Sequence, residues 1–132
     1  RTLAENELDL VPLRAAGLEG MADATPFSLA DPEGLTATLE AAGFAQVRLH
    51  ACDEAVSSGD VDAMASVLLR VGSLGRILRE TPALRPDAEP RLRAALAARE
   101  RDGQVALTAA TWIVTARAAG HAARGTQPAP TA

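Results

Sequence analysis

The sequence predicts an α/β fold in which two strands are combined with three to four helices. Residues 45–53 alternate apolar and polar side chains with the period of two that is typical of a strand with one buried face. Residues 104–117 contain the strongest β-forming run of the chain. The other long stretches place apolar residues at helical spacing and end at glycine or proline. We therefore expect one domain over residues 1–118 and a disordered tail over 119–132.

Residues 1–44 are expected to form a helix, a lid and a second helix. The first helix has apolar side chains at helical spacing, at Leu8, Val11 and Ala15. Residues 17–30 hold glycine, proline and scattered polar residues, which are typical of a loop or lid, and Phe27 is their one large apolar anchor. Asp31 caps the second helix, and Gly43 ends it.

Residues 60–102 are expected to form helices inserted between the two strands. Asp60 caps the first of them, and Pro82 ends the second. The third helix, over residues 87–102, is rich in arginine and glutamate. Its apolar stripe is thin and consists of Leu92, Ala95 and Leu96. This pattern predicts an outer, solvated helix.

The final strand has apolar or weakly polar side chains on both faces, including Trp112 on one and Ile113 on the other. A strand of this kind is typical of the inside of a covered sheet, with a neighbour at each edge. The chain offers it only the strand at 45–53, and the second edge is a template for pairing. We expect the other neighbours to lie upstream of Arg1.

Composition excludes several classes of protein. At 132 residues and 48% hydrophobic, the chain has the length and apolar content of one globular domain. Its net charge of -4 argues against a protein that binds nucleic acid phosphates, which requires a clustered basic surface. No apolar stretch reaches the roughly 20 residues of a membrane helix. The single cysteine, Cys52, cannot form an internal disulfide, which favours a reducing, cytoplasmic setting.

The order of these elements resembles a known family. The segment "PFSLADPEGLTATLEAAGFAQVRLHACD" is followed by the helical group and then by "DGQVALTAATWIVTARA". This order resembles the C-terminal part of a class I S-adenosylmethionine-dependent methyltransferase of the small-molecule type. In that family a helix ending in "AAGF" leads into the sixth strand, and a strand like "WIVTARA" runs antiparallel as the seventh, between the fifth and sixth. The early "LAENE" is similar to the segment after the fifth strand.

The resemblance covers nearly all of residues 2–118 and implies the C-terminal end of a Rossmann-like doubly wound sheet. It implies methyl transfer to a small organic acceptor by the full-length protein. The cofactor S-adenosylmethionine is then bound by an N-terminal half that this chain lacks, because the chain has no G-x-G-x-x-G turn after a strand. The chain alone is expected to be inactive. An in-line displacement relies on positioning, so no residue here has to be catalytic.

Two residues are predicted to bind the substrate: Asn6, from the resemblance, and Phe27, from its place in the lid segment. Asn6 lies between Glu5 and Glu7, where the family places groups that reach the substrate, although Leu8 stands where relatives often carry an aromatic residue. The alternative for Asn6 is an ordinary solvated helix start. Phe27 closes over the acceptor from the lid, or alternatively anchors the lid to the core.

The remaining candidates favour structural roles. His50 and Cys52 share a strand face, but no further histidine or cysteine pair completes a metal site, and no metal is expected. Trp112 is expected to pack within the sheet. The competing function is a non-enzymatic α+β interaction module. In either case we expect pairing at a sheet edge, with a second copy of the chain, with another partner chain or with the N-terminal half.

Overall fold

The computed structural model describes residues 1–119 of the chain. Its helices and strands are α1 (Glu7–Ala16), α2 (Pro32–Ala41), β1 (Phe44–Gly59), α3 (Val61–Leu68), α4 (Gly72–Glu80), α5 (Arg85–Ala97) and β2 (Val105–Ala118). The α/β class is confirmed, and the described residues form five α-helices where three to four were predicted. The disordered tail was predicted over residues 119–132, and all of it but residue 119 lies outside the described residues.

β1 and β2 form a two-stranded antiparallel ribbon. Its register runs without interruption from Arg48 opposite Thr115 to Val56 opposite Leu107, with an irregularity at each end of that stretch. The two antiparallel strands are as predicted, but β1 continues to Gly59, past its predicted end. The polar end of β1 has no alternation of its own, and its pairing with distant residues of β2 makes it a strand. The described residues form this ribbon only, so the larger Rossmann-like sheet is not confirmed.

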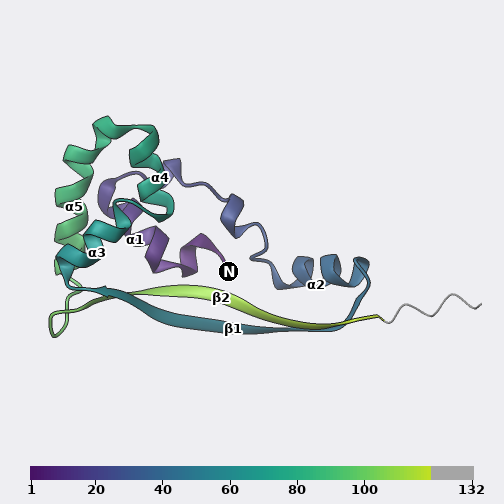
Figure 1. The fold of residues 1–132 in the computed structure, drawn as a ribbon. Coiled ribbons are helices and arrows are strands. Elements are labelled where there is room, and N and C mark those ends of the chain that lie inside the picture. Colours follow the sequence, from purple (N-terminus) through teal and green to yellow (C-terminus); the bar gives the residue numbers. More distant parts are fainter. Residues whose placement is uncertain (120–132) are drawn as a thin grey trace, which may run out of the picture.

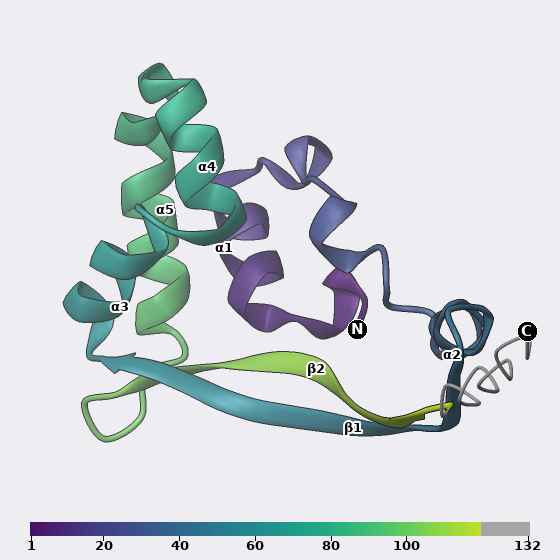
Figure 2. The same cartoon turned by 45° about the vertical axis from the view of Figure 1, so that its right-hand side comes forward.

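The hydrophobic core lies where α1, α3, α4 and α5 pack together over one end of the ribbon (Figure 1). The most deeply buried side chains include Leu13, Met64, Leu74, Ile77, Leu92, Leu96, Val105 and Leu107. The last two belong to β2, which attaches the ribbon to the helices. In both views β2 lies on the helix side of the ribbon and β1 is the outer strand (Figures 1 and 2).

α5 is a core helix, which corrects the prediction of an outer, solvated helix. Leu92 and Leu96 have no exposed surface, and Ala88 is 2% exposed. These three residues are spaced four apart, so they form one narrow line that packs against α1 and α3. The arginine and glutamate side chains cover the rest of the helix, where Arg93 pairs with Glu89 and Asp62.

α2 lies over the other end of the ribbon (Figure 2). The predicted cap is confirmed, because the Asp31 carboxylate accepts hydrogen bonds from the backbone N–H groups of Glu33 and Gly34. Gly43, at φ 88°, then turns the chain from α2 into β1 in a conformation that disfavours other residues. No residue of α2 is fully buried, so this end of the molecule is less densely covered than the core.

The second half of β2 is open to solvent. Ile113 is 51% exposed and Val114 is 37% exposed. The expected covering of both faces of this strand is therefore not found among the described residues. A ribbon of two strands needs a further strand or a helix to be stable. Among the described residues, this half is approached by α2, by the segment before α2 and by Arg1.

Candidate functional site

A groove of about 540 Å³ opens between α2, residues 26–30 and the second half of β2. Its walls are mostly apolar and include Phe27, Leu35, Leu39, Phe44, Trp112 and Val114. Arg1 and Thr111 are the polar residues among the described lining, which holds no histidine, cysteine or carboxylate. The groove therefore has the composition of a binding site for an apolar molecule and carries no group for moving a proton near neutral pH.

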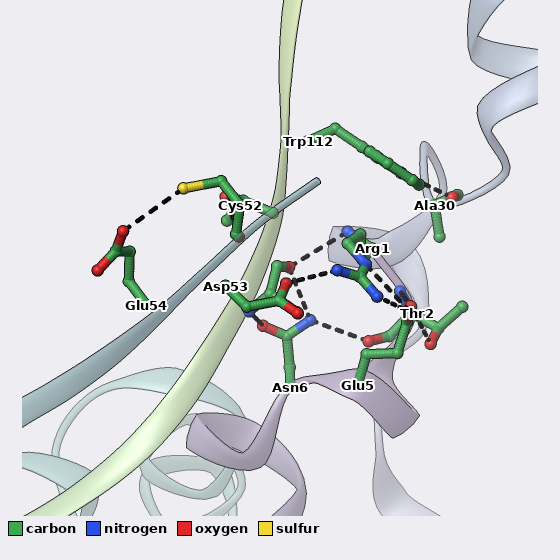
Figure 3. Close-up of polar contacts among 11 residues, drawn as sticks. Arg1, Thr2, Glu5, Asn6, Ala30, Cys52, Asp53, Glu54 and Trp112 are labelled. Carbon is green, nitrogen blue, oxygen red and sulfur yellow. Dashed lines mark hydrogen bonds and ion pairs between the residues drawn. The ribbon is translucent and has the colours of Figure 1, made fainter. Parts of the chain in front are cut away.

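Trp112 joins the two walls of the groove. Its indole Nε1 donates a hydrogen bond of 2.9 Å to the carbonyl oxygen of Ala30 (Figure 3). This bond ties the end of the lid segment to β2 and holds the ring at the groove. Phe27, the predicted substrate-side residue of the lid, lines the same groove and is half-buried. The structure thus brings Phe27 and Trp112 to one cavity.

Arg1 covers the ring of Trp112, with its guanidinium carbon 5.4 Å from the ring centroid. The same guanidinium is paired with the carboxylates of Glu5 and Asp53 (Figure 3). A cation over the face of an indole is attracted by the negative face of the ring, and two carboxylates fix its direction. The guanidinium of Arg1 is consequently a charged group in the otherwise apolar lining of the groove.

The hydrogen bonds of Arg1 and then of Thr2 lower the pKa of Glu5 to about 2. Because this pKa is lowered in the folded state, the bonds contribute stability that is complete above the ordinary pKa of 4.5 and is lost as the pH falls through about 2. The position of Arg1 at the groove is therefore maintained throughout the neutral range.

Asn6 lies outside the groove and is 8% exposed. Its side-chain amide donates to the carbonyl oxygens of Ala110 and Thr2, at 3.1 and 2.9 Å, and accepts from the backbone N–H of Ala110 at 2.8 Å. Asn6 thereby pairs with the edge of β2 as the backbone of a further strand does. Its role in substrate binding stays a prediction, and the contacts assign it to the sheet edge.

Within residues 1–119, hydrogen bonds from other segments to the outer edge of β2 are found at only two positions. The backbone N–H of Thr108 donates to the Glu7 carboxylate at 3.1 Å, and that of Ala110 donates to Asn6. Since the backbone groups of a strand alternate between its two edges, the N–H groups at 112, 114 and 116 point to the same outer edge. No hydrogen bond to these three groups is found among the described residues. This half of the edge is an open pairing template.

The structural role predicted for His50 and Cys52 stays a prediction. Among residues 1–119 no group of three or more histidine, cysteine or acidic side chains is arranged to hold a metal ion. The Cys52 thiol lies 3.7 Å from a carboxylate oxygen of Glu54, and the Asp53 carboxylate is ion-paired with Arg1. Within the same part of the chain, no helix has the length and apolar character needed to cross a membrane.

Sequence reasoning missed Arg1 and Trp112 as lining residues of the groove. Trp112 has the pattern of a sheet-packing residue, and its indole hydrogen bond to Ala30 joins positions 82 residues apart. The sequence did contain one indication that Trp112 lines the groove. Trp112 alternates with Val114 on one face of the final strand, and the helix ending in "AAGF" was expected beside that strand.

Comparison of the chain with protein-family models, with curated proteins and with solved structures finds no match. The groove and the open edge of β2 are therefore the features from which a function is inferred.

Proposed function

We propose that this chain is the C-terminal part of an S-adenosylmethionine-dependent methyltransferase of the small-molecule type, and that the groove beside Phe27 and Trp112 receives the methyl acceptor. The observation that carries the proposal is the apolar cavity of about 540 Å³ between the lid segment and the final strand. Its volume and lining are typical of sites for small organic ligands. Two aromatic walls and the leucines of α2 favour an acceptor with a flat apolar body.

The direction of the N-terminal segment supports a larger sheet. The backbone nitrogen of Arg1 lies 3.4 Å from the carbonyl oxygen of Ala110, and Glu7 bonds to Thr108, so this segment runs opposite to β2. A preceding segment that continued in this direction would pass the open edge at Val114 as an antiparallel neighbour. In the proposal that neighbour is the fifth strand, β2 is the seventh and β1 is the sixth. This arrangement gives the ribbon a third strand.

The described residues do not fit the cofactor by themselves. β1 leads directly into α3, which is the strand-to-helix turn where a glycine-rich cradle would stand, but this turn holds Gly59 alone. The carboxylate of Asp60 already accepts the backbone N–H of Ala63 there, at 2.9 Å. We therefore assign the cofactor to residues N-terminal to this chain. The described residues bind and orient the acceptor and exclude water from it.

The coding sequence upstream of Arg1 is the first test. The proposal requires an open frame that encodes a strand, a glycine-rich turn and a helix. The longer protein should then transfer a labelled methyl group from S-adenosylmethionine to members of a panel of aromatic hydroxyl and amine compounds. An in-frame stop codon with a start site just before Arg1, or a longer protein that binds no cofactor, contradicts the proposal.

The 132-residue chain alone is expected not to bind S-adenosylmethionine, because the strand-to-helix turn found within residues 1–119 lacks the glycine cradle. Isothermal titration calorimetry of the purified chain should detect no heat of binding at cofactor concentrations up to about 1 mM, roughly the weak end of useful affinity. Binding in the micromolar range would place a cofactor site within these residues.

In the longer protein, Phe27→Ala is expected to raise the KM for the acceptor about tenfold, because it removes one aromatic wall of the groove. The KM for S-adenosylmethionine should change less than about twofold. Met21→Ala is the matched control, since Met21 is an exposed apolar residue of the same segment that does not line the groove. If Phe27→Ala changes the KM for both substrates equally, or if the two variants change the acceptor KM equally, Phe27 only anchors the loop.

A second candidate function, a non-enzymatic interaction module, is favoured by the open edge beside Val114. In this alternative a partner chain supplies the third strand. Val114→Pro removes an N–H that points to the outer edge while leaving the bonds to β1 in place, so it blocks such pairing. The upstream coding sequence separates the two functions, because only the methyltransferase requires a continuous N-terminal half.

A further inference from the structure

The second strand edge of the molecule belongs to β1 and faces away from every helix. Because the outer groups of β2 stand at 108 and 110, its odd-numbered residues bond to β1. In the register, Thr111 is opposite Cys52 and Ile113 is opposite His50, so the even-numbered residues of β1 are bonded within the ribbon. The backbone groups of the odd-numbered residues 49, 51, 53 and 55 therefore point outward.

This edge is long, regular and uncovered. The register shifts lie before Arg48 and after Val56, and no irregularity interrupts the strand between them. Among the described residues, no backbone or side-chain group is hydrogen-bonded to the outward groups of this stretch. Figures 1 and 2 show β1 as the outer strand with no other described segment beyond it. A regular unpaired strand of this length is a template for another strand.

The charges along β1 match those of a second β1 that runs in the opposite direction. Arg48, His50, Cys52 and Glu54 lie on one face of the ribbon, because strand residues two apart share a face. Neither Arg48 nor Glu54 has an ion-pair partner among the described residues. Antiparallel pairing centred on Ala51 places Arg48 opposite Glu54 of the second copy, and the two-fold axis repeats this pair.

The neighbouring registers are less favourable. Centring on Asp53 sets Asp53 opposite its own copy, which places like charges directly across the strands. Centring on Cys52 leaves Arg48 opposite Val56, and centring on His50 leaves it opposite Cys52. Only the Ala51 register gives two cross-strand ion pairs with no like-charge contact, and it also pairs the outward backbone groups of Leu49 and Asp53.

We propose that two copies of this chain associate through β1, with Ala51 at the two-fold axis, to form a continuous four-stranded antiparallel sheet. The outer face of this sheet carries Arg48 opposite Glu54 at two symmetric positions and His50 opposite Cys52 at two more. The association uses the edge opposite to the one assigned to the upstream strand. It therefore does not depend on the proposed methyl transfer, and either can fail without the other.

The charge register is tested with Arg48→Glu, Glu54→Arg and the double variant, using sedimentation equilibrium of the full chain. Each single variant replaces two attractive pairs by two repulsive ones and is expected to raise the dimer dissociation constant at least about tenfold. The double variant exchanges the charges and should restore the constant to within about threefold of the original. Circular dichroism confirms that each variant is folded. Single variants with unchanged dimer affinity overturn the proposed register.

The axis is tested with His50→Cys under mild oxidation. In the Ala51 register the introduced cysteine is directly opposite Cys52 of the second copy. The two residues form a pair without hydrogen bonds to each other, with Cα atoms about 4.5 Å apart, which a disulfide can bridge. Mass spectrometry should find the disulfide between positions 50 and 52 of different copies. The unaltered chain should remain uncrosslinked, and a Cys52 to Cys52 disulfide would place the axis elsewhere.

The edge itself is tested with a matched pair of proline variants. Ala51→Pro removes an outward N–H of β1, and Val114→Pro removes an outward N–H of β2, while both leave the bonds between the strands intact. We expect Ala51→Pro to be monomeric and Val114→Pro to keep the dimer. The reverse result assigns association to β2 and overturns the proposal. A monomer at every concentration of the unaltered chain overturns it as well.

Discussion

Leu92→Ala is expected to lower the free energy of unfolding by about 3 kcal/mol, within the range of roughly 2 to 5 kcal/mol for leucine in a close-packed core. Leu92 has no exposed surface and lies in the cluster formed by α1, α3, α5 and the start of β2. The substitution removes buried methyl groups and leaves a cavity that the surrounding side chains fill only in part. Urea unfolding followed by circular dichroism measures the effect.

Arg91→Ala is the matched control for Leu92→Ala, because Arg91 is the neighbouring residue and is exposed. A surface substitution of this kind is expected to change stability by less than about 0.5 kcal/mol. Similar costs for the two variants would mean that α5 is not part of the core. Both variants should be measured at one protein concentration, since the proposed association would add concentration-dependent stability.

The error about α5 has a physical origin. The helix holds three arginines, one aspartate and one glutamate around a line of one small and two large apolar residues, Ala88, Leu92 and Leu96. A line this narrow is typical of a solvated helix when it is considered alone. It becomes fully buried because neighbouring elements pack on that line from several directions. The sequence of α5 does not contain this information, since the partners lie in α1, α3 and β2.

Local signals were predicted well, because they depend on few residues. The caps at Asp31 and Asp60 and the glycine turn at Gly43 follow from hydrogen bonding and backbone conformation within four residues. The two strands followed from alternation and β propensity, and their antiparallel direction was implied by the resemblance to the methyltransferase family. The extension of β1 to Gly59 was not predicted, because it depends on the distant pairing with Val105.

Of the two candidate site residues, Phe27 could be placed from a local pattern and Asn6 could not. Phe27 was selected as the one large apolar residue of a flexible segment, and the structure places it in the groove. The contacts of Asn6 are non-local, since its amide bonds to Ala110 across 104 positions of sequence. The sequence could indicate a polar residue at a helix start. It could not indicate that the side-chain amide both donates a hydrogen bond to the edge of β2 and accepts one from it.

Asn6→Asp is expected to lower the free energy of unfolding by about 3 kcal/mol at pH 8, and by less at pH 4. The carboxylate can still accept the N–H of Ala110, but it cannot donate to the carbonyl oxygens of Ala110 and Thr2, which the amide now serves. A buried charge that faces two carbonyl oxygens to which it cannot donate carries the penalty of desolvation and repulsion.

The pH dependence of the Asn6→Asp variant identifies the cause. Facing two carbonyl oxygens raises the pKa of the introduced carboxyl in the folded state above its unfolded value of about 3.9. The stability of the variant is therefore highest below that value, where the protonated acid can donate a hydrogen bond, and is lost as the pH rises through the folded pKa. Asn6→Ala leaves the backbone N–H of Ala110 without its acceptor and adds no charge, so it should cost about 2 kcal/mol with little difference between pH 4 and pH 8. If the difference in unfolding free energy between Asn6→Asp and Asn6→Ala is independent of pH, the amide of Asn6 does not serve the edge of β2, and a place beside the substrate becomes the better explanation.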